Sequence, residues 1–137
     1  MKVEEVLKCN QAIKSIIDNS KDVSALVKFK LLGICKQFEP IVENFEEVKE
    51  EAIQKYGSKD SNGRFGIFYP DRKQYSDADF KAAVEEYDDA MHKFNNDIRS
   101  LLNTDVNINI CKFKYADVMN ADIPSDCLIV LYDFIEE

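Results

Sequence analysis

Hydrophobic residues recur at steps of three and four along three stretches of the chain, which is the spacing of amphipathic helices. The strongest repeat lies in the second stretch, where the steps alternate without a miss, and it predicts a helix over residues 23–56. Pro40 removes one backbone hydrogen bond inside this helix, so we expect a helix kinked near Pro40 rather than a chain reversal. The apolar row of this helix consists of Val27, Leu31, Ile34, Phe38, Ile41, Phe45, Val48 and Ala52.

The other two stretches predict a helix over residues 2–18 and a helix over residues 77–102. The apolar row of the later helix is nearly as long as that of residues 23–56, and one connector, residues 57–75, joins the two. Two such rows most simply pack on each other, so we expect a long antiparallel helical hairpin. The second row consists of Phe80, Val84, Tyr87, Met91, Phe94, Ile98 and Leu101.

The C-terminal part of the chain changes character. Apolar residues alternate with asparagines there, which predicts a strand over residues 105–115. The apolar segment after Pro124 predicts a short buried helix over residues 125–135. The predicted fold class is therefore mainly α with a minor β part, in the connector or near the C-terminus. At 137 residues the chain has the usual size of one domain, so we expect a single domain over residues 1–137.

The chain is acidic, with a formal net charge of −8. Such a surface repels nucleic acid and anionic membranes and favours a protein partner with a basic surface. In an antiparallel hairpin, the acidic stretches of the two long helices come to the same end. They form a candidate docking patch, although a solvated helix surface explains them as well, and no loop has the ligand spacing of a calcium site. The residues of this patch are Glu43, Glu46, Glu47, Glu50, Glu85, Asp88 and Asp89.

The connector is the second candidate for a contact surface. Its Asn62-Gly63 pair favours a tight turn with positive φ, and the residues that follow are strand-like. A connector of this length is long for a compact domain, and such loops often carry function. Its aromatic and cationic residues are types found at binding hot spots, but they could equally fix the loop to the helices. The candidates for partner contact are Phe68, Tyr69 and Arg72.

No catalytic constellation is recognisable. The one histidine, His92, falls off the apolar row of its helix and has no partners at metal-ligand spacing. Four cysteines, at positions 9, 35, 111 and 127, are too far apart for a metal knuckle. Residues 1–20 carry charges throughout and lack an apolar core segment, so we expect no secretory signal. No apolar run has the length of a membrane span. We therefore predict a cytoplasmic protein with reduced thiols that is not an enzyme and carries no cofactor or metal.

The order of elements resembles that of small uncharacterised proteins encoded by phages and prophages of Gram-positive bacteria. Three pieces carry the resemblance: a helix centred on Phe38-Glu39-Pro40, its exit from Glu50 to Asp60 followed by Asn62-Gly63, and an ending of strand, Ile123-Pro124 and a helix with Leu128, Leu131, Phe134 and Ile135. The resemblance implies a phage context, with no mechanism and no functional residue. The connector residues Phe65 to Tyr75 depart from the family's pattern.

These observations predict a non-enzymatic phage-type accessory protein that binds another protein stoichiometrically. The favoured version is an inhibitor of a bacterial defence system. The alternative is a virion structural or assembly factor, such as a chaperone for a tail or head protein, and a small enzyme or nucleotide-binding protein is a third class. A homodimer is also possible if the first helix leaves an apolar face uncovered.

Overall fold

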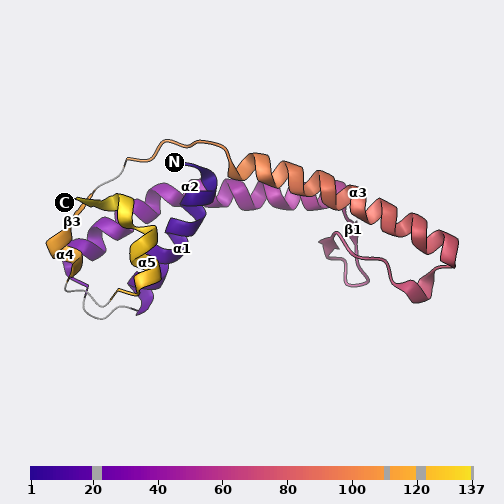
Figure 1. The fold of residues 1–137 in the computed structure, drawn as a ribbon, viewed down its shortest axis with the longest axis horizontal. Coiled ribbons are helices and arrows are strands. Elements are labelled where there is room, and N and C mark those ends of the chain that lie inside the picture. The colour runs from indigo at the N-terminus through magenta and orange to yellow at the C-terminus, as the bar shows by residue number, and fades with distance from the viewer. Residues whose placement is uncertain (20–22, 110–111, 120–122, 137) are drawn as a thin grey trace. The chain divides into compact units, whose positions relative to one another are not determined.

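The computed structural model describes residues 1–19, 23–109, 112–119 and 123–136. It is mainly helical, with a long helix pair, small strands and a short C-terminal helix, which confirms the predicted fold class (Figure 1). The chain divides into two compact units. The first comprises Met1–Glu43 and Asn103–Glu137, and the second comprises Asn44–Leu102. The expectation that the whole chain folds as one domain stays a prediction.

Two helices and the C-terminal segment build the first unit. Helix α1 spans Val3–Asn19, and helix α2 spans Ala25–Tyr56, of which the part up to Glu43 belongs to this unit. Ser24 begins α2, because its hydroxyl accepts a hydrogen bond from the backbone N–H of Val27 at 3.2 Å. Helix α2 continues through Pro40, whose predicted kink stays a prediction.

The first half of the apolar row on α2 is buried in the core of the first unit. Leu31, Ile34 and Phe38 are buried in one cluster with side chains of α1 and of the C-terminal segment. The expectation that these residues zip against the apolar row of α3 is therefore wrong. A three-and-four repeat shows that one face of a helix is buried, but it does not say which element covers that face. The partners in the cluster include Val6, Cys9, Ile13, Ile16, Phe113, Val118, Leu131 and Phe134.

The C-terminal segment folds as several short elements. Strand β3, Phe113–Lys114, leads into helix α4, Tyr115–Met119. Helix α5, Ser125–Val130, is followed by the 3-10 turn η2, Tyr132–Phe134. Strand β4, Ile135–Glu136, then pairs parallel to β3.

Two predicted boundaries in this segment are wrong. The strand expected over 105–115 is regular only in β3; residues 106–109 have no regular structure, and residues 110 and 111 lie outside the described part. The helix expected over 125–135 ends at Val130, since Phe134 is buried in the core and Ile135 pairs with Phe113. Backbone hydrogen bonds to β3 thus replace the last turns of the expected helix.

The described cysteines of the first unit, Cys9, Cys35 and Cys127, are buried and free; Cys111 lies outside the described residues. Cys9 is only 4% exposed, and its thiol sulfur lies 3.8 Å from the Val130 carbonyl oxygen. Burial, and then the charges of Glu5 and Asp133, raise the pKa of Cys9 from its ordinary value near 9 to about 11.

The raised pKa of Cys9 predicts a loss of stability at high pH. As the pH rises past about 9, the unfolded thiol loses its proton first, so the free energy of unfolding falls until about pH 11. We expect a Cys9→Ser variant, which lacks this titration, to give a flatter curve in that window. Urea unfolding of both proteins at a series of pH values measures the difference, and equal slopes would contradict the assignment.

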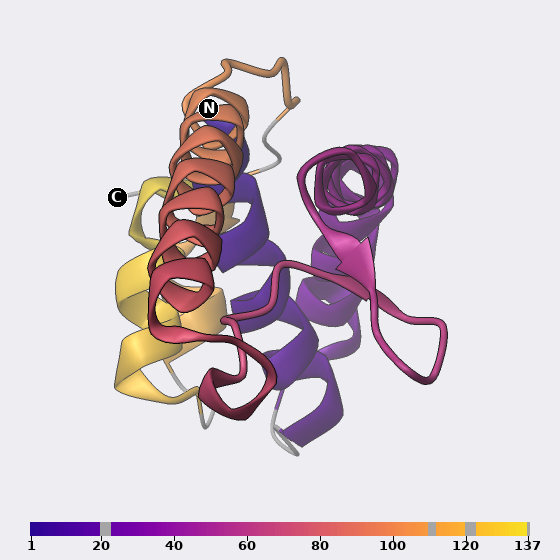
Figure 2. The same cartoon turned by 90° about the vertical axis from the view of Figure 1, so that its right-hand side faces the viewer.

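Two antiparallel helices build the second unit: the Asn44–Tyr56 part of α2 and helix α3, Asp77–Leu102 (Figure 1). Figure 2 shows the connector crossing from the end of α2 to the start of α3. The structure describes every residue of this unit, and Phe45 is the only buried side chain in it. The second unit therefore leaves much of its apolar surface partly open to solvent.

Candidate functional site

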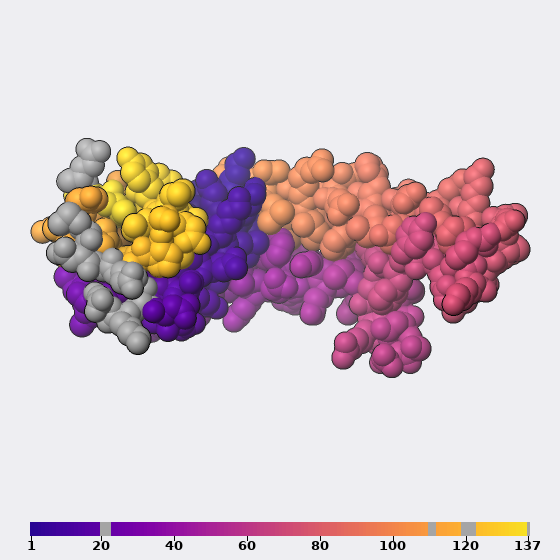
Figure 3. All heavy atoms as spheres, turned by 60° about the horizontal axis from the view of Figure 1, so that its bottom comes forward, coloured from indigo at the N-terminus to yellow at the C-terminus, as the bar shows by residue number. Residues whose placement is uncertain are grey.

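A small β-hairpin holds the start of the connector. Strands β1, Ser58–Lys59, and β2, Phe65–Gly66, pair antiparallel. The Asp60 carboxylate closes the turn by accepting hydrogen bonds from the backbone N–H groups of Asn62 at 2.8 Å and Arg64 at 2.9 Å. Gly63 has φ of 77°, as the Asn62-Gly63 pair led us to expect, because glycine adopts this conformation without steric cost. The hairpin stands out from the helices of the second unit (Figure 3).

The hairpin lies very close to the end of α2. A Cβ atom on Gly57 would lie 2.3 Å from the Gly66 carbonyl oxygen and 2.6 Å from that of Ile53. A Cβ atom on Gly66 would lie 2.5 Å from the ring of Phe68. Two glycines thus allow the hairpin to approach the helix and the Phe68 ring to cover the hairpin backbone.

Arg72 anchors the second part of the connector. It lies in the 3-10 turn η1, Arg72–Gln74, whose first residue follows the capping carboxylate of Asp71. The Arg72 guanidinium donates to the Asp77 carboxylate and to the Tyr75 carbonyl oxygen, the latter at 3.2 Å. It also lies over the ring of Phe80, 5.0 Å from the centroid. Arg72 therefore fixes the connector to the start of α3.

Tyr69 packs edge-on against two rings of α3. Its ring centroid lies 6.2 Å from that of Phe80 and 5.3 Å from that of Tyr87. Tyr69 nevertheless stays 60% exposed, and Phe68 and Tyr75 are exposed too. We call these exposed rings together with Arg72 the connector face: Phe68, Tyr69, Arg72 and Tyr75.

A groove of about 580 Å³ runs beside the connector face. Its walls come from the connector on one side and from α3 on the other, and Tyr56 and Gly57 lie at its α2 end. The α3 residues of the groove are Ala83, Glu86, Tyr87 and Ala90. Sequence reasoning missed them, because the row containing Phe80 and Tyr87 was assigned to contacts with α2. The signal for these contacts was the number of aromatic residues in the connector, because so many rings in a polar loop need apolar partners.

The acidic residues do not share one end of the helix pair, so that expectation is wrong. The Tyr56 hydroxyl donates to the Asp97 carboxylate at 2.7 Å, which sets the alignment of α2 and α3. Glu50 precedes Tyr56 by six residues, and Asp89 precedes Asp97 by eight in the antiparallel helix. At 1.5 Å per residue, about 20 Å along the helix axes separates Glu50 from Asp89. Glu46 and Glu47 lie farther still, and Glu43 belongs to the first unit.

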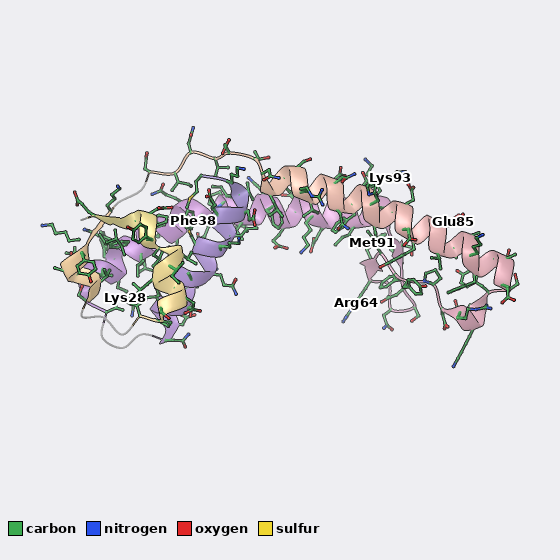
Figure 4. The ribbon with its side chains drawn as sticks, viewed as in Figure 1. Lys28, Phe38, Arg64, Glu85, Met91 and Lys93 are labelled. Atoms are coloured by element: carbon green, nitrogen blue, oxygen red, sulfur yellow. The ribbon has the colours of Figure 1, made fainter. Side chains whose placement is uncertain are left out.

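The acidic residues of α3 also lie away from the groove. At 100° per residue, Glu85 and Asp89 are on the side of α3 opposite Tyr87. Lys93 binds Asp89 at 3.0 Å, and Figure 4 shows Lys93 on the side of α3 away from the hairpin that carries Arg64. The hydrogen bond to Asp89 raises the pKa of Lys93. All seven acidic residues of the predicted patch are exposed, in two separate groups: Glu43, Glu46, Glu47 and Glu50 on α2, and Glu85, Asp88 and Asp89 on α3.

A second hollow, of about 600 Å³, lies in the first unit. Tyr115 and Tyr132, both exposed, line it together with Lys112, Asp133 and Ile135. None of the residues predicted from the sequence to contact a partner lies there. The connector face is the stronger candidate, because it joins predicted contact residues with rings held in a defined geometry.

His92 is exposed, and one of its ring nitrogens lies 3.2 Å from the side-chain amide of Asn96. In the part of the chain that the structure describes, no three His, Cys, Asp or Glu side chains are grouped so that they could hold a metal ion. Within the same residues, no helix is both long and apolar enough to cross a bilayer. Comparisons of the chain with protein-family models, curated proteins and solved structures found no match.

Proposed function

We propose that this chain is a non-enzymatic, phage-type accessory protein that binds another protein stoichiometrically through the connector face. The exposed tyrosine ring of Tyr69 carries the proposal. Phe80 and Tyr87 hold this ring in place, so it presents apolar area to a partner with little further loss of conformational freedom. Rigid aromatic rings beside an arginine are the residue types that dominate binding energy at protein interfaces.

The partner is expected to have a basic surface. Asp77 neutralises the Arg72 guanidinium, whereas Glu86, Asp60 and Asp71 contribute carboxylates to the groove. A cationic side chain entering the groove would meet aromatic ring faces and carboxylates together. The favoured partner is a component of a bacterial defence system, which the chain would inhibit. A virion protein under assembly is the alternative.

Loss of the Tyr69 ring tests this proposal. We expect Tyr69→Ser to weaken binding to a cognate partner about 30-fold, as for an interface hot spot of about 2 kcal/mol. The matched control is Tyr115→Ser, which removes a ring of nearly equal exposure, 59%, from the first unit. Partners captured from infected Gram-positive cells are purified and titrated by calorimetry with both variants.

Circular dichroism shows whether Tyr69→Ser keeps its helices. If Tyr69→Ser unfolds the connector, Phe68→Ser tests the connector face in its place, because it removes another exposed ring. A captured nuclease complex supports the inhibitor, and a tail or head protein supports the assembly factor. Equal binding by the wild type and both connector variants would show that the connector face does not bind the partner.

The two acidic groups are tested separately, since they lie far apart. Reversal to lysine at Glu46, Glu47 and Glu50 forms one variant, and reversal at Glu85, Asp88 and Asp89 forms the other. If one group contacts a basic partner, we expect its reversal to lower the affinity of the protein for that partner about tenfold or more. The loss should be strongest at low salt. Unchanged affinity in both variants would assign these residues to the solvated helix surface.

A further inference from the structure

An apolar stripe on the first part of α2 faces solvent. Leu26, Phe29 and Leu32 follow one another at three-residue steps, on the side of the helix opposite the buried row. They are 56%, 76% and 45% exposed. Single exposed apolar residues are common, but three adjacent ones rimmed by charge mark a contact surface. Gly33 lies within the same stripe, and a Cβ atom there would meet nothing within 4 Å, so the stripe is open.

Lysines surround this stripe. Residues 25–37 contain Lys28, Lys30 and Lys36 and no carboxylate, although the whole chain carries a net charge of −8. By helical spacing, Lys36 lies two turns beyond Phe29 on the same side of α2, and Lys28 lies at the edge of the stripe. Among described residues, neither Lys28 nor Lys36 has a carboxylate within ion-pair distance. The stripe and its lysines thus favour an acidic helical surface.

The second unit offers such a surface on its own part of α2. Residues 44–54 contain Glu46, Glu47, Glu50 and Glu51 against one lysine. Glu46, Glu47 and Glu50 share one side of the helix, and Val48 nearby is exposed. These three glutamates also lack an ion pair with any described residue.

We propose that the basic apolar stripe of one copy binds the glutamate surface, Glu46, Glu47 and Glu50, of a second copy. Both surfaces are exposed, unpaired and opposite in charge. The stripe with its lysines covers about three helical turns, from Leu26 to Lys36, and the glutamates cover about one turn, from Glu46 to Glu50. The contact joins two different surfaces of the chain. Two copies that make it reciprocally form an isologous dimer, and copies that make it head-to-tail form a heterologous row.

The dependence of self-association on salt and on the Phe29 ring tests this contact. Light scattering and sedimentation equilibrium follow the mass of the protein up to millimolar concentration, at low and high salt. We expect self-association that weakens with salt and weakens at least tenfold in Phe29→Ser. The matched control is Ile129→Ser, which removes an equally exposed side chain from α5 and should leave association unchanged.

The decisive variants reverse one side at a time. Lys28→Glu with Lys36→Glu, and Glu47→Lys with Glu50→Lys, should each abolish association alone and restore it when the two proteins are mixed. Lys2→Glu with Lys8→Glu changes the net charge equally, at the residue before α1 and on α1, and should not act. A wild-type protein that stays monomeric overturns the proposal. So does binding to anionic vesicles that requires Phe29 in an otherwise monomeric protein, which would assign the stripe to a lipid surface.

Discussion

Replacement of Phe38 by alanine is expected to lower the free energy of unfolding by about 3–5 kcal/mol. Phe38 is fully buried among the side chains of α1, α2 and the C-terminal segment, so its loss leaves a cavity that close-packed neighbours fill only in part. Urea unfolding followed by circular dichroism measures the change, because most of the described chain is helical.

Phe29→Ala is the matched control for Phe38→Ala. Both positions are phenylalanines on α2 in the first unit, but Phe29 is 76% exposed. We expect it to change the free energy of unfolding by no more than about 0.5 kcal/mol in dilute solution. Comparable losses in the two variants would mean that the first unit is not built around the Phe38 side of α2.

The second large effect is expected from Gly57→Ala. The new Cβ would overlap the backbone carbonyl oxygens of Gly66 and Ile53, and backbone atoms cannot turn aside as a side chain can. The hairpin must therefore move away from α2, at a cost of about 1–3 kcal/mol. Partner binding should weaken too, because the hairpin leads directly into the connector face.

Gly33→Ala is expected to raise the free energy of unfolding, whereas Gly57→Ala lowers it. Gly33 lies inside α2, and nothing lies within 4 Å of its added Cβ, so alanine only reduces the freedom of the unfolded chain. We expect a gain of about 0.5–1 kcal/mol. Thermal unfolding of the two variants beside the wild type checks both signs, and a stabilised Gly57→Ala would show that the hairpin does not approach α2 as closely as described.

The sequence by itself determined the helices and the turn of the connector. Steps of three and four identify a helix through its own backbone geometry, whatever covers its apolar side. Gly63 follows the same local logic, since positive φ is a property of one residue. Asn62-Gly63 and the long helices were therefore predictable without knowledge of the fold.

Only the tertiary structure decided what each apolar row touches. Phe38 could have met α3 or α1, because both offer apolar side chains, and periodicity carries no information about the partner. Tyr87 likewise packs against Tyr69 of the connector. The end of α5 was decided in the same way, since pairing of Ile135 with Phe113 competes with another helical turn. The alignment of α2 and α3 also depends on contacts between residues far apart in the chain, such as Tyr56 with Asp97. This alignment separates Glu50 from Asp89, so the separation could not be predicted from the sequence.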